Sequence, residues 1–509
     1  MTILPSPKAA PDRPLRVSAI VGFLVFVELA SGFVQGYYNP LFSEIARHNG
    51  VSDADITWFI VVQTLSAAVS VPILSRLGDI FGHRRILRIA MLLVLAGVLV
   101  VAFSANYALV LVGRVLVGPL AVWLPLEVSL IHSRIKGQTA RKAIGFLVSA
   151  LTLGVVVGTL AAGVASTIIR NLTGVMLVPA AFIAVGVLAV FFAVPESATR
   201  TRKRLDYLGF AGLAAVMCAL LWGLRQAQVF GFASADSMLP LLAAAALLVA
   251  WVAWERRTQS PAVDLRVLGA RTLWPIYAAS FLAGTVIFGT VTILPTFLAS
   301  DPVKAGYGLA LSPGAIALYT AFTTICSTAG AAVFSYAARV IGLRGVLMSG
   351  AVIGAVGYVL LAFLHREAWQ IWLGIGLTGF SAGVLTGALP AAIAEAAPPD
   401  QTGIATGVYS SIKTLGGSAA GAVFGVVLAS LTFHGSKAPT DQGYATVWLL
   451  SAAAFALCPL VLAALRPARR RLEEPLAETS NETASSDIAL REVILQENAP
   501  QENIERTSL

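Results

Sequence analysis

Long apolar stretches follow one another along almost the whole chain, separated by short polar segments. Roughly fourteen of them reach about twenty residues, the length that a helix needs to cross the ~30 Å hydrocarbon core of a bilayer once. Backbone groups in lipid must be hydrogen-bonded within the spanning structure, and the alternating ten-residue pattern of membrane barrel strands is absent. We therefore predict an all-α integral membrane protein with transmembrane helices at residues 17–40, 55–75, 84–104, 108–132, 142–168, 174–194, 206–225, 238–254, 273–298, 311–335, 343–364, 369–392, 402–431 and 443–465.

Composition and charge agree with a membrane protein and predict its orientation. Hydrophobic residues make up 57% of the 509-residue chain and charged residues only 12%, which excludes a water-soluble domain. Lysine and arginine gather in alternate loops, for example at Arg84, Arg141 and Arg204, and beside the first and last helices. Cytoplasmic loops carry this excess, so we expect both termini in the cytoplasm and the chain in the cell membrane. The net charge of +9 therefore does not indicate a nucleic-acid partner.

The two ends of the chain lie outside the helical pattern. Residues 1–16 are expected to form a cytoplasmic N-terminal segment. The first apolar stretch is too long for the core of a signal peptide and carries Glu28, so we interpret it as a retained helix. Residues 466–509 mix Glu, Asn, Ser and Thr with little apolar periodicity, which predicts a disordered cytoplasmic tail.

Two parts of the sequence repeat internally. Spans five and thirteen share a pair of glycines, Gly154 and Gly158 in the first and Gly417 and Gly421 in the second. The loop after the second helix recurs after the tenth at a constant offset, so that Ser75, Gly82, Arg84 and Leu87 correspond to Ser335, Gly342, Arg344 and Leu347. Both repeats run in the same direction through the membrane, which is typical of transporters built from two parallel halves.

The repeated loop carries the resemblance to a known family. Its sequence GDIFGHRR, at residues 78–85, resembles the signature loop between helices 2 and 3 of the major facilitator superfamily. Asp79 can accept hydrogen bonds from a helix N-terminus, Gly82 allows a tight turn, and the arginines can bind the ends of neighbouring helices. A positively charged cytoplasmic loop of no special function remains the alternative. The resemblance implies two six-helix bundles, at residues 17–194 and 271–465, joined by a linker at 195–270 with two additional transmembrane helices.

The family also implies a network of charges at the cytoplasmic mouth. Glu127 and Arg134 keep a Glu-x6-Arg spacing at the end of the fourth span, and Glu196 follows the sixth. By resemblance we assign an inner gate to Asp79, Gly82, Arg84, Arg85, Glu127, Arg134 and Glu196.

A motif in the fifth span narrows the resemblance to one branch. Residues 154–163 resemble the antiporter motif of fourteen-span drug:proton antiporters, with Thr159 where proline is usual and Ala162 in place of a closing glycine. Arg114 and Gly118 are similar to the family's fourth-helix motif. Small residues also let two helices approach closely, so close packing alone is the alternative for Gly154, Gly158, Thr159 and Gly163.

Charges inside a membrane are costly and therefore need a reason. Glu28 lies about 16 Å into the first helix, close to the midplane. Partial shielding from water favours its neutral form and a nearby guanidinium favours its charged form, so Glu28 is the candidate proton site and Arg114 its candidate partner. A permanent ion pair between them is the alternative. The branch usually has an Asp about one turn further on, where this chain has Ser31, so Glu28 either replaces that Asp or binds substrate. Lys413 is a third candidate charge in the cavity.

Polar and aromatic residues within the spans are candidates for substrate contact, although interfacial anchoring or packing explains such residues equally well. They are Gln35, Tyr37, Tyr38, Asn39, Gln63, Trp123, Tyr319 and Trp372. If Glu28 is protonated while Arg114 and Lys413 stay charged, the cavity is positive. We therefore expect no exclusive preference for cationic drugs.

We interpret the chain as a proton-coupled secondary exporter of amphipathic small molecules, either drugs or a dedicated metabolite, that works by alternating access and as a monomer. A proton-coupled nutrient importer is one alternative, and a membrane sensor is another, although the tail is too short for a signalling domain. An enzyme is not indicated, because Walker A, metal-ligand and Gly-x-Ser-x-Gly motifs are absent. No metal and no cofactor are expected.

Overall fold

The computed structural model describes residues 17–132, 137–192, 206–258, 273–397, 402–433, 436 and 438–463, which belong to one compact unit. Within this part of the chain the regular elements are helices, and a single isolated bridge joins Thr432 to Pro439. The predicted all-α fold is thus confirmed. The predicted N-terminal segment at 1–16, the residues 195–205 of the linker and the predicted disordered tail lie outside the described residues.

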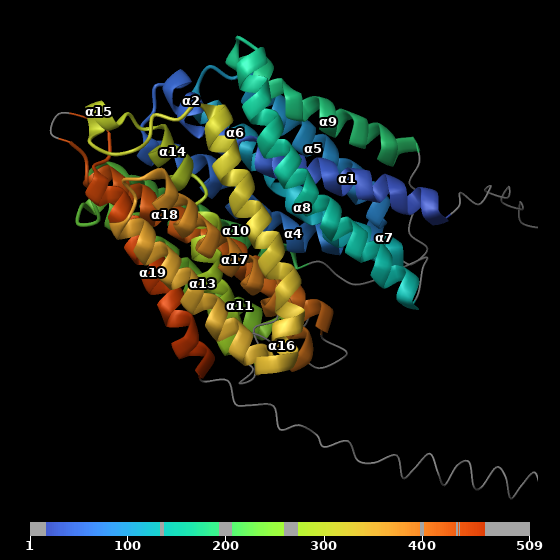
Figure 1. Cartoon of the computed structure of the whole chain (residues 1–509). Helices are drawn as coiled ribbons and strands as arrows, with labels where there is room; N and C mark the ends of the chain where they lie inside the picture. Colours follow the sequence, from blue (N-terminus) through green and yellow to red (C-terminus); the bar gives the residue numbers. More distant parts are fainter. Residues whose placement is uncertain are drawn as a thin grey trace, which may run out of the picture. The chain divides into compact units, whose positions relative to one another are not determined.

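The first six-helix bundle precedes residue 193, and several of its membrane crossings are assembled from consecutive shorter helices (Figure 1). Its elements are α1 (Val17–Tyr37), η1 (Asn39–Leu41), α2 (Phe42–His48), α3 (Asp53–Ile56), α4 (Trp58–Phe81), α5 (His83–Phe103), α6 (Tyr107–Val117), η2 (Gly118–Val122), α7 (Trp123–His132), α8 (Gly137–Ile168) and α9 (Leu172–Phe192).

Two additional helices separate this bundle from the second one. They are α10 (Tyr207–Phe230) and α11 (Ala235–Arg257). The second bundle consists of α13 (Trp274–Gly289), α14 (Ile293–Ala299), α15 (Pro302–Ala305), α16 (Pro313–Phe363), α17 (Ala368–Ala396), α18 (Thr402–Ser430) and α19 (Asp441–Ala463).

The described residues contain 13 helical stretches long and apolar enough to cross a membrane. One of them, α16, has 51 residues and would be about 75 Å long if straight, more than twice the thickness of the hydrocarbon core. Its backbone leaves the helical conformation at Gly342, where φ is 73°, so α16 comprises two crossings. The structure therefore agrees with the fourteen predicted crossings.

Two of the predicted single helices are interrupted. The predicted helix at 108–132 contains the 3-10 turn η2, where Pro119 has no N–H to donate and clashes with the preceding turn of an α-helix. The predicted helix at 273–298 is divided between α13 and α14, with Thr290 and Val291 in the break. Apolar length predicted these crossings, but it did not reveal where their hydrogen-bonding pattern changes.

The internal repeat of the sequence appears in the backbone as well. Gly82 and Gly342 both have a positive φ, 104° and 73°, a backbone conformation that residues other than glycine rarely adopt. Two residues later, Arg84 donates from Nη2 to the carbonyl oxygen of Phe191 at 2.8 Å, and Arg344 donates from Nη2 to that of Ala463 at 3.0 Å. In both halves, the turn is thus fastened to the last residues of the bundle's final helix.

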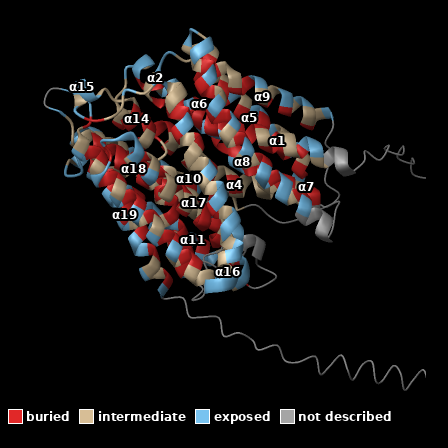
Figure 2. Cartoon of the chain, viewed as in Figure 1, coloured by how far each residue is buried: buried red, intermediate tan, exposed pale blue. Residues whose placement is uncertain are grey.

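Each bundle has its own apolar core, and apolar side chains also cover the outside. One core runs from Leu24 to Val190, and the other is formed mainly by residues between Leu273 and Leu462. Figure 2 shows exposed residues along the outer faces of the helices, and many of these are large and apolar, such as Phe103 and Val249. An apolar outer face is expected of helices that contact lipid.

The two bundles contact each other near one end. We call the end that carries α2, α3, α14 and α15 the loop end, and the opposite end, where α1 begins and α19 ends, the terminal end (Figure 1). Tyr444 donates to Asp53 at 3.1 Å across the bundles, and Ser418 donates to Thr64 at 2.8 Å. The bundles are therefore joined towards the loop end.

The two additional helices pack on each other, and α10 also packs against α4 and α18. Arg225 of α10 forms an ion pair with Asp55 at 2.5 Å, and Gln228 hydrogen-bonds to Asp55 and to Trp58. These contacts fix α10 to the first bundle at the loop end. No described residue of α10 or α11 lines the cavity described below.

Candidate functional site

A cavity of about 290 Å³ lies between the bundles, mostly within the second one. Its walls come from α13, α14, α16, α17 and α19, with Asn39 and Val155 as the contribution of the first bundle. This volume is close to the lower limit of the ~300–1,000 Å³ typical of small-molecule sites. The cavity is thus large enough for a small organic molecule.

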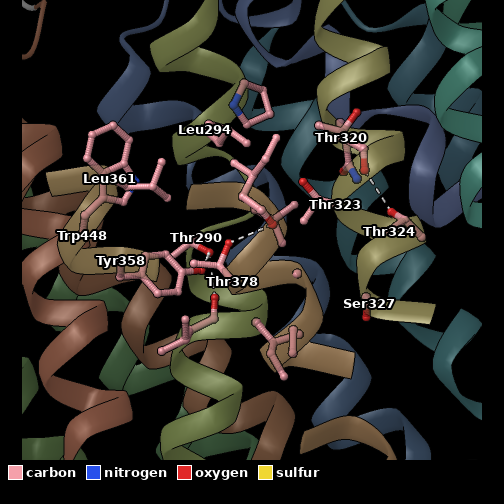
Figure 3. Close-up of a pocket in the computed structure, with 18 of the residues that line it drawn as sticks. Thr290, Leu294, Thr320, Thr323, Thr324, Ser327, Tyr358, Leu361, Thr378 and Trp448 are labelled. Atoms are coloured by element: carbon pink, nitrogen blue, oxygen red, sulfur yellow. Dashed lines mark hydrogen bonds between the residues drawn. The ribbon is translucent and has the colours of Figure 1, made fainter. Parts of the chain in front are cut away.

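The wall combines hydroxyl groups with apolar and aromatic side chains. Figure 3 shows Thr320, Thr323, Thr324 and Ser327 along one helix, and opposite them Thr290, Tyr358 and Thr378 with Leu361 and Trp448. Among the residues that the structure describes, no charged side chain lines the cavity. The site can therefore offer hydrogen bonds and apolar contact, but no ion pair.

Of the residues predicted to contact substrate, Asn39 lines this cavity. Tyr38 and Trp123 are at most 1% exposed, and the Tyr319 ring packs against Trp372 with 4.4 Å between centroids. Gln35 is exposed and donates to Ser31, Gln63 is partly buried, and Tyr37 donates to Val175 at 2.7 Å. In this conformation Asn39 alone of the predicted set borders the cavity.

Glu28 is buried in the interior of the first bundle, 1% exposed on α1. Neither carboxyl oxygen makes a hydrogen bond to a group in the described part of the chain. The carboxyl group interacts electrostatically with that of Glu127 on α7, which is fully buried and likewise makes no hydrogen bond within this part. The structure thus places two acidic groups together, one of which the sequence assigned to the gate.

Arg114, the expected partner of Glu28, lies elsewhere. Its Nε donates to the carbonyl oxygen of Phe59 at 3.2 Å, and its guanidinium lies 4.0 Å from the centroid of the Phe59 ring and 4.9 Å from that of Tyr38. Tyr38 is ten residues beyond Glu28, about 15 Å along the helix. The structure therefore does not bring Glu28 and Arg114 together, and Arg114 is held by a carbonyl and two aromatic faces.

Lys413 lies on α18 and is partly buried. Its Nζ is 5.0 Å from the centroid of the Tyr409 ring and 5.7 Å from that of Phe288. Val286 and Ile287, which precede Phe288 in α13, line the cavity, but Lys413 does not. Its positive charge is therefore close to the cavity without being part of the wall.

The residues assigned to the inner gate do not all lie together. Asp79, Gly82 and Arg84 are together at the turn between α4 and α5, where Asp79 interacts with His83 at 3.2 Å. Arg85 is exposed. Glu127 lies beside Glu28 instead of pairing with these residues, although its neighbour Leu126 packs near Gly78. Arg134 and Glu196 lie outside the described residues.

The antiporter motif of α8 forms a close contact with α1. A Cβ on Gly158 would collide with the carbonyl oxygen of Phe33, and one on Gly154 would collide with that of Leu29. Thr159 donates to the carbonyl oxygen of Gly36 at 3.1 Å. At the loop end, Gly163 packs against Gly314 and Ala317 of the other bundle. The motif thus joins two helices within one bundle and continues to the interface between bundles.

The hydroxyl-lined wall was not among the residues predicted from the sequence. Thr320, Thr323, Thr324 and Ser327 recur at intervals of three and four, which puts them on one face of a helix. A polar stripe of this kind on an otherwise apolar membrane helix faces the bundle interior or a cavity. The spacing of these four residues could have indicated a cavity wall from the sequence. Thr290 and Thr378 belong to no such pattern.

Comparison with known proteins identifies the family. The model of the Major Facilitator Superfamily matches residues 24–323 and again 276–498. The chain is 25% identical over 516 residues to the "Probable actinorhodin transporter" of Streptomyces coelicolor, covering 98% of this chain and 83% of that protein. It is 26% identical over 397 residues to the "Tetracenomycin C resistance and export protein" of Streptomyces glaucescens, covering 74% and 69%.

The fold agrees with a solved transporter. The crystal structure of the nucleoside transporter NupG is matched with a TM-score of 0.60 and 15% identity, over 88% of this chain and 99% of that one. The family match, the relative named as a transporter and the relative named as a resistance and export protein support the predicted resemblance to the drug:proton antiporter branch. The chain therefore belongs to the Major Facilitator Superfamily, and it is a multi-pass membrane transporter of small molecules and not an enzyme.

Proposed function

We propose that this transporter is a proton-coupled exporter of amphipathic small molecules, drugs or a dedicated metabolite, that works by alternating access. The observation that carries the proposal is Glu28, a buried acid whose two carboxyl oxygens make no hydrogen bond to the described part of the chain. An ionised carboxylate in such a place, without a cation or a donor, costs far more than a neutral carboxylic acid. Glu28 therefore holds a proton in this conformation.

The neighbouring acid strengthens this reasoning. Two buried carboxyl groups that interact electrostatically do not both ionise easily, because each charge disfavours the other. Glu28 and Glu127 accordingly act as one proton-binding unit that keeps at least one proton while it is shielded from water. Loss of that proton requires water or a cation to reach the pair, which a change in the packing of the bundles provides.

The direction of access follows from the contacts between the bundles. These contacts lie towards the loop end, at Asp53 with Tyr444 and at Thr64 with Ser418. The positive-inside rule assigns the terminal end to the cytoplasm. The conformation described here is then closed towards the outside. Rocking of the bundles opens the loop end, releases the substrate and lets a proton from outside reach the acidic pair.

Export is favoured over import by the relatives. One of them is named as a resistance and export protein, and the match to it extends over 74% of this chain. Arg114 stabilises the outer half of the first bundle through Phe59 and Tyr38 and does not neutralise the proton site. Lys413 makes the surroundings of the cavity positive, which disfavours a cationic cargo.

Dye efflux from cells tests this function. Cells that produce the protein are loaded with the neutral fluorescent phenol 2-naphthol or the cationic dye ethidium, and the loss of fluorescence is followed with and without an uncoupler. We expect faster loss of 2-naphthol than in cells with an empty vector, and we expect the uncoupler to abolish the difference. Glu28→Gln should behave like the empty vector, whereas Glu44→Gln, at the surface of α2, should behave like the wild type. Efflux that persists with the uncoupler would contradict proton coupling, and protein-dependent dye uptake would contradict export.

A further inference from the structure

The threonine hydroxyls of the cavity wall share one orientation. Each is hydrogen-bonded to a carbonyl oxygen three or four residues earlier in its own helix, as threonines in membrane helices commonly are. The bonds are Thr290 to Val286 at 2.8 Å, Thr320 to Ile316 at 3.0 Å, Thr323 to Tyr319 at 3.0 Å, Thr324 to Thr320 at 3.0 Å and Thr378 to Ile375 at 3.3 Å.

This orientation determines what the wall can offer to a ligand. A hydroxyl group has one hydrogen to donate and two lone pairs to accept. Because the hydrogen of each threonine points to its own backbone, the lone pairs remain for a bound molecule. Tyr358 lies 3.1 Å from the Thr290 hydroxyl, and since Thr290 donates to Val286, Tyr358 is the donor of this contact. The polar part of the cavity is thus rich in acceptors.

The rest of the wall is suited to a flat apolar body. Trp448, Phe455 and Tyr358 provide aromatic surface, and Leu294 and Leu361 add aliphatic surface. A dry cavity of about 150 Å³ holds one benzene molecule. A cavity of about 290 Å³ therefore has room for roughly two aromatic rings.

The charges near the cavity argue for a neutral ligand. No described acidic or basic side chain lines the wall, so a charged ligand would lose water without gaining an ion pair. A cation close to the cavity is Lys413, whose Nζ lies 5.7 Å from the centroid of the Phe288 ring, next to the wall residue Ile287. Lys413 repels an ammonium group on a ligand. Because Lys413 does not line the wall, it does not form an ion pair with an anionic ligand there.

We propose that this cavity binds an uncharged aromatic molecule that carries hydroxyl groups as hydrogen-bond donors, such as a polyphenol. The proposal names the substrate class of the transport site and rests on the proposed function for the fate of the bound molecule. A ligand with acceptors only could accept from the Asn39 amide and the Ser327 hydroxyl. At each threonine, however, it would force the hydroxyl hydrogen away from the backbone, at the loss of an existing hydrogen bond. A ligand with donors binds without that loss.

Equilibrium binding to the purified full-length chain in lipid nanodiscs tests the proposal. The probe is tritiated 1,5-dihydroxynaphthalene, and the competitors are its dimethyl ether, 1-naphthylmethylammonium and 1-naphthoate. We expect saturable binding of the diol and at least tenfold weaker competition by each of the other three. Because binding requires neither a proton gradient nor export, this result is independent of the dye-efflux test.

Variants locate the binding in the cavity. Thr323→Val keeps the shape of the side chain and removes its acceptor, so we expect about fivefold weaker binding of the diol. Thr323→Ser keeps the hydroxyl and should bind like the wild type. Thr328→Val is the matched control, because Thr328 is back-bonded in the same helix at 2.9 Å but does not line the cavity.

Four results would overturn the proposal. Absence of saturable diol binding would refute the substrate class, and so would equal competition by the dimethyl ether. Stronger competition by the ammonium or the carboxylate would refute the preference for a neutral molecule. Equal affinities of the Thr323→Val and Thr328→Val variants would show that the diol binds elsewhere.

Discussion

Replacing Gly158 with alanine tests whether the antiporter motif of α8 acts through close packing against α1. An added Cβ would collide with the carbonyl oxygen of Phe33 and lie 2.8 Å from its Cα. Ordinary contacts of a Cβ begin at 3.4 Å. The two helices would have to separate locally by about 1 Å, enough to forfeit a quarter to a half of the van der Waals attraction along the seam.

The magnitude follows from known costs of overpacking. An inserted methyl group in a well-packed interior destabilises by about 1–3 kcal/mol. The contact between the two helices has no spare room, because a Cβ on Gly154 of α8 or on Gly32 of α1 would also collide with the backbone of the facing helix. For a chain of 509 residues, such a loss corresponds to a melting temperature lower by about 1–3 °C.

The assay compares melting temperatures of detergent-solubilised variants at one heating rate. Gly145 is the control, because it lies on the same helix and a Cβ there would meet nothing within 4 Å. Gly145→Ala should melt at the wild-type temperature or slightly above it, since alanine favours the helix by about 1 kcal/mol relative to glycine. Equal melting temperatures for Gly158→Ala and Gly145→Ala would refute the packing argument and leave the motif in need of another role.

Two further substitutions test the charged residues of the first bundle. Arg114→Lys should slow 2-naphthol efflux severalfold at unchanged expression, because an ammonium cannot both donate to the Phe59 carbonyl and stack on the Tyr38 and Phe59 rings; wild-type efflux would contradict this. Asp79→Asn should likewise impair efflux while leaving expression and melting temperature close to wild type, because the loss of charge weakens the contact with His83 at the turn between α4 and α5, which we assign to the inner gate; an unchanged efflux rate would remove Asp79 from the gate.

Much of the fold could be predicted from the sequence because its signals are strong and local. The length of an apolar stretch predicts a membrane crossing whatever packs beside it. The internal repeat that matches Gly82 with Gly342 predicted equivalent turns in the two halves. The break at Thr290 was missed, because an interruption of a helix that stays apolar leaves hydropathy unchanged. Its position matters, since it adds a hydroxyl to the cavity wall.

The site was harder to predict because it depends on which faces of different helices meet. The position of Glu28 within the first predicted membrane helix identified it as a buried acid. Its depth in the membrane alone does not show which residue lies beside it. Arg114 was the expected partner because it lies in the same bundle, yet it contacts the rings of Tyr38, just after α1, and of Phe59 on α4 instead. Glu127 was assigned to the cytoplasmic mouth by its place in the chain, while in the structure it is fully buried and interacts electrostatically with Glu28.

Proton movement by the purified transporter in lipid vesicles tests the central claim most directly. Vesicles enclosing a pH-sensitive dye receive an outward gradient of 1,5-dihydroxynaphthalene or, in a parallel series, of 2-naphthol, and the internal pH is recorded. For the wild type we expect protons to move opposite to the transported compound. For Glu28→Gln, which mimics the protonated acid, we expect exchange of labelled compound across the membrane without any change in internal pH. Substrate-driven proton movement in Glu28→Gln at the wild-type rate would contradict the account, because Glu28 would then not carry the coupled proton.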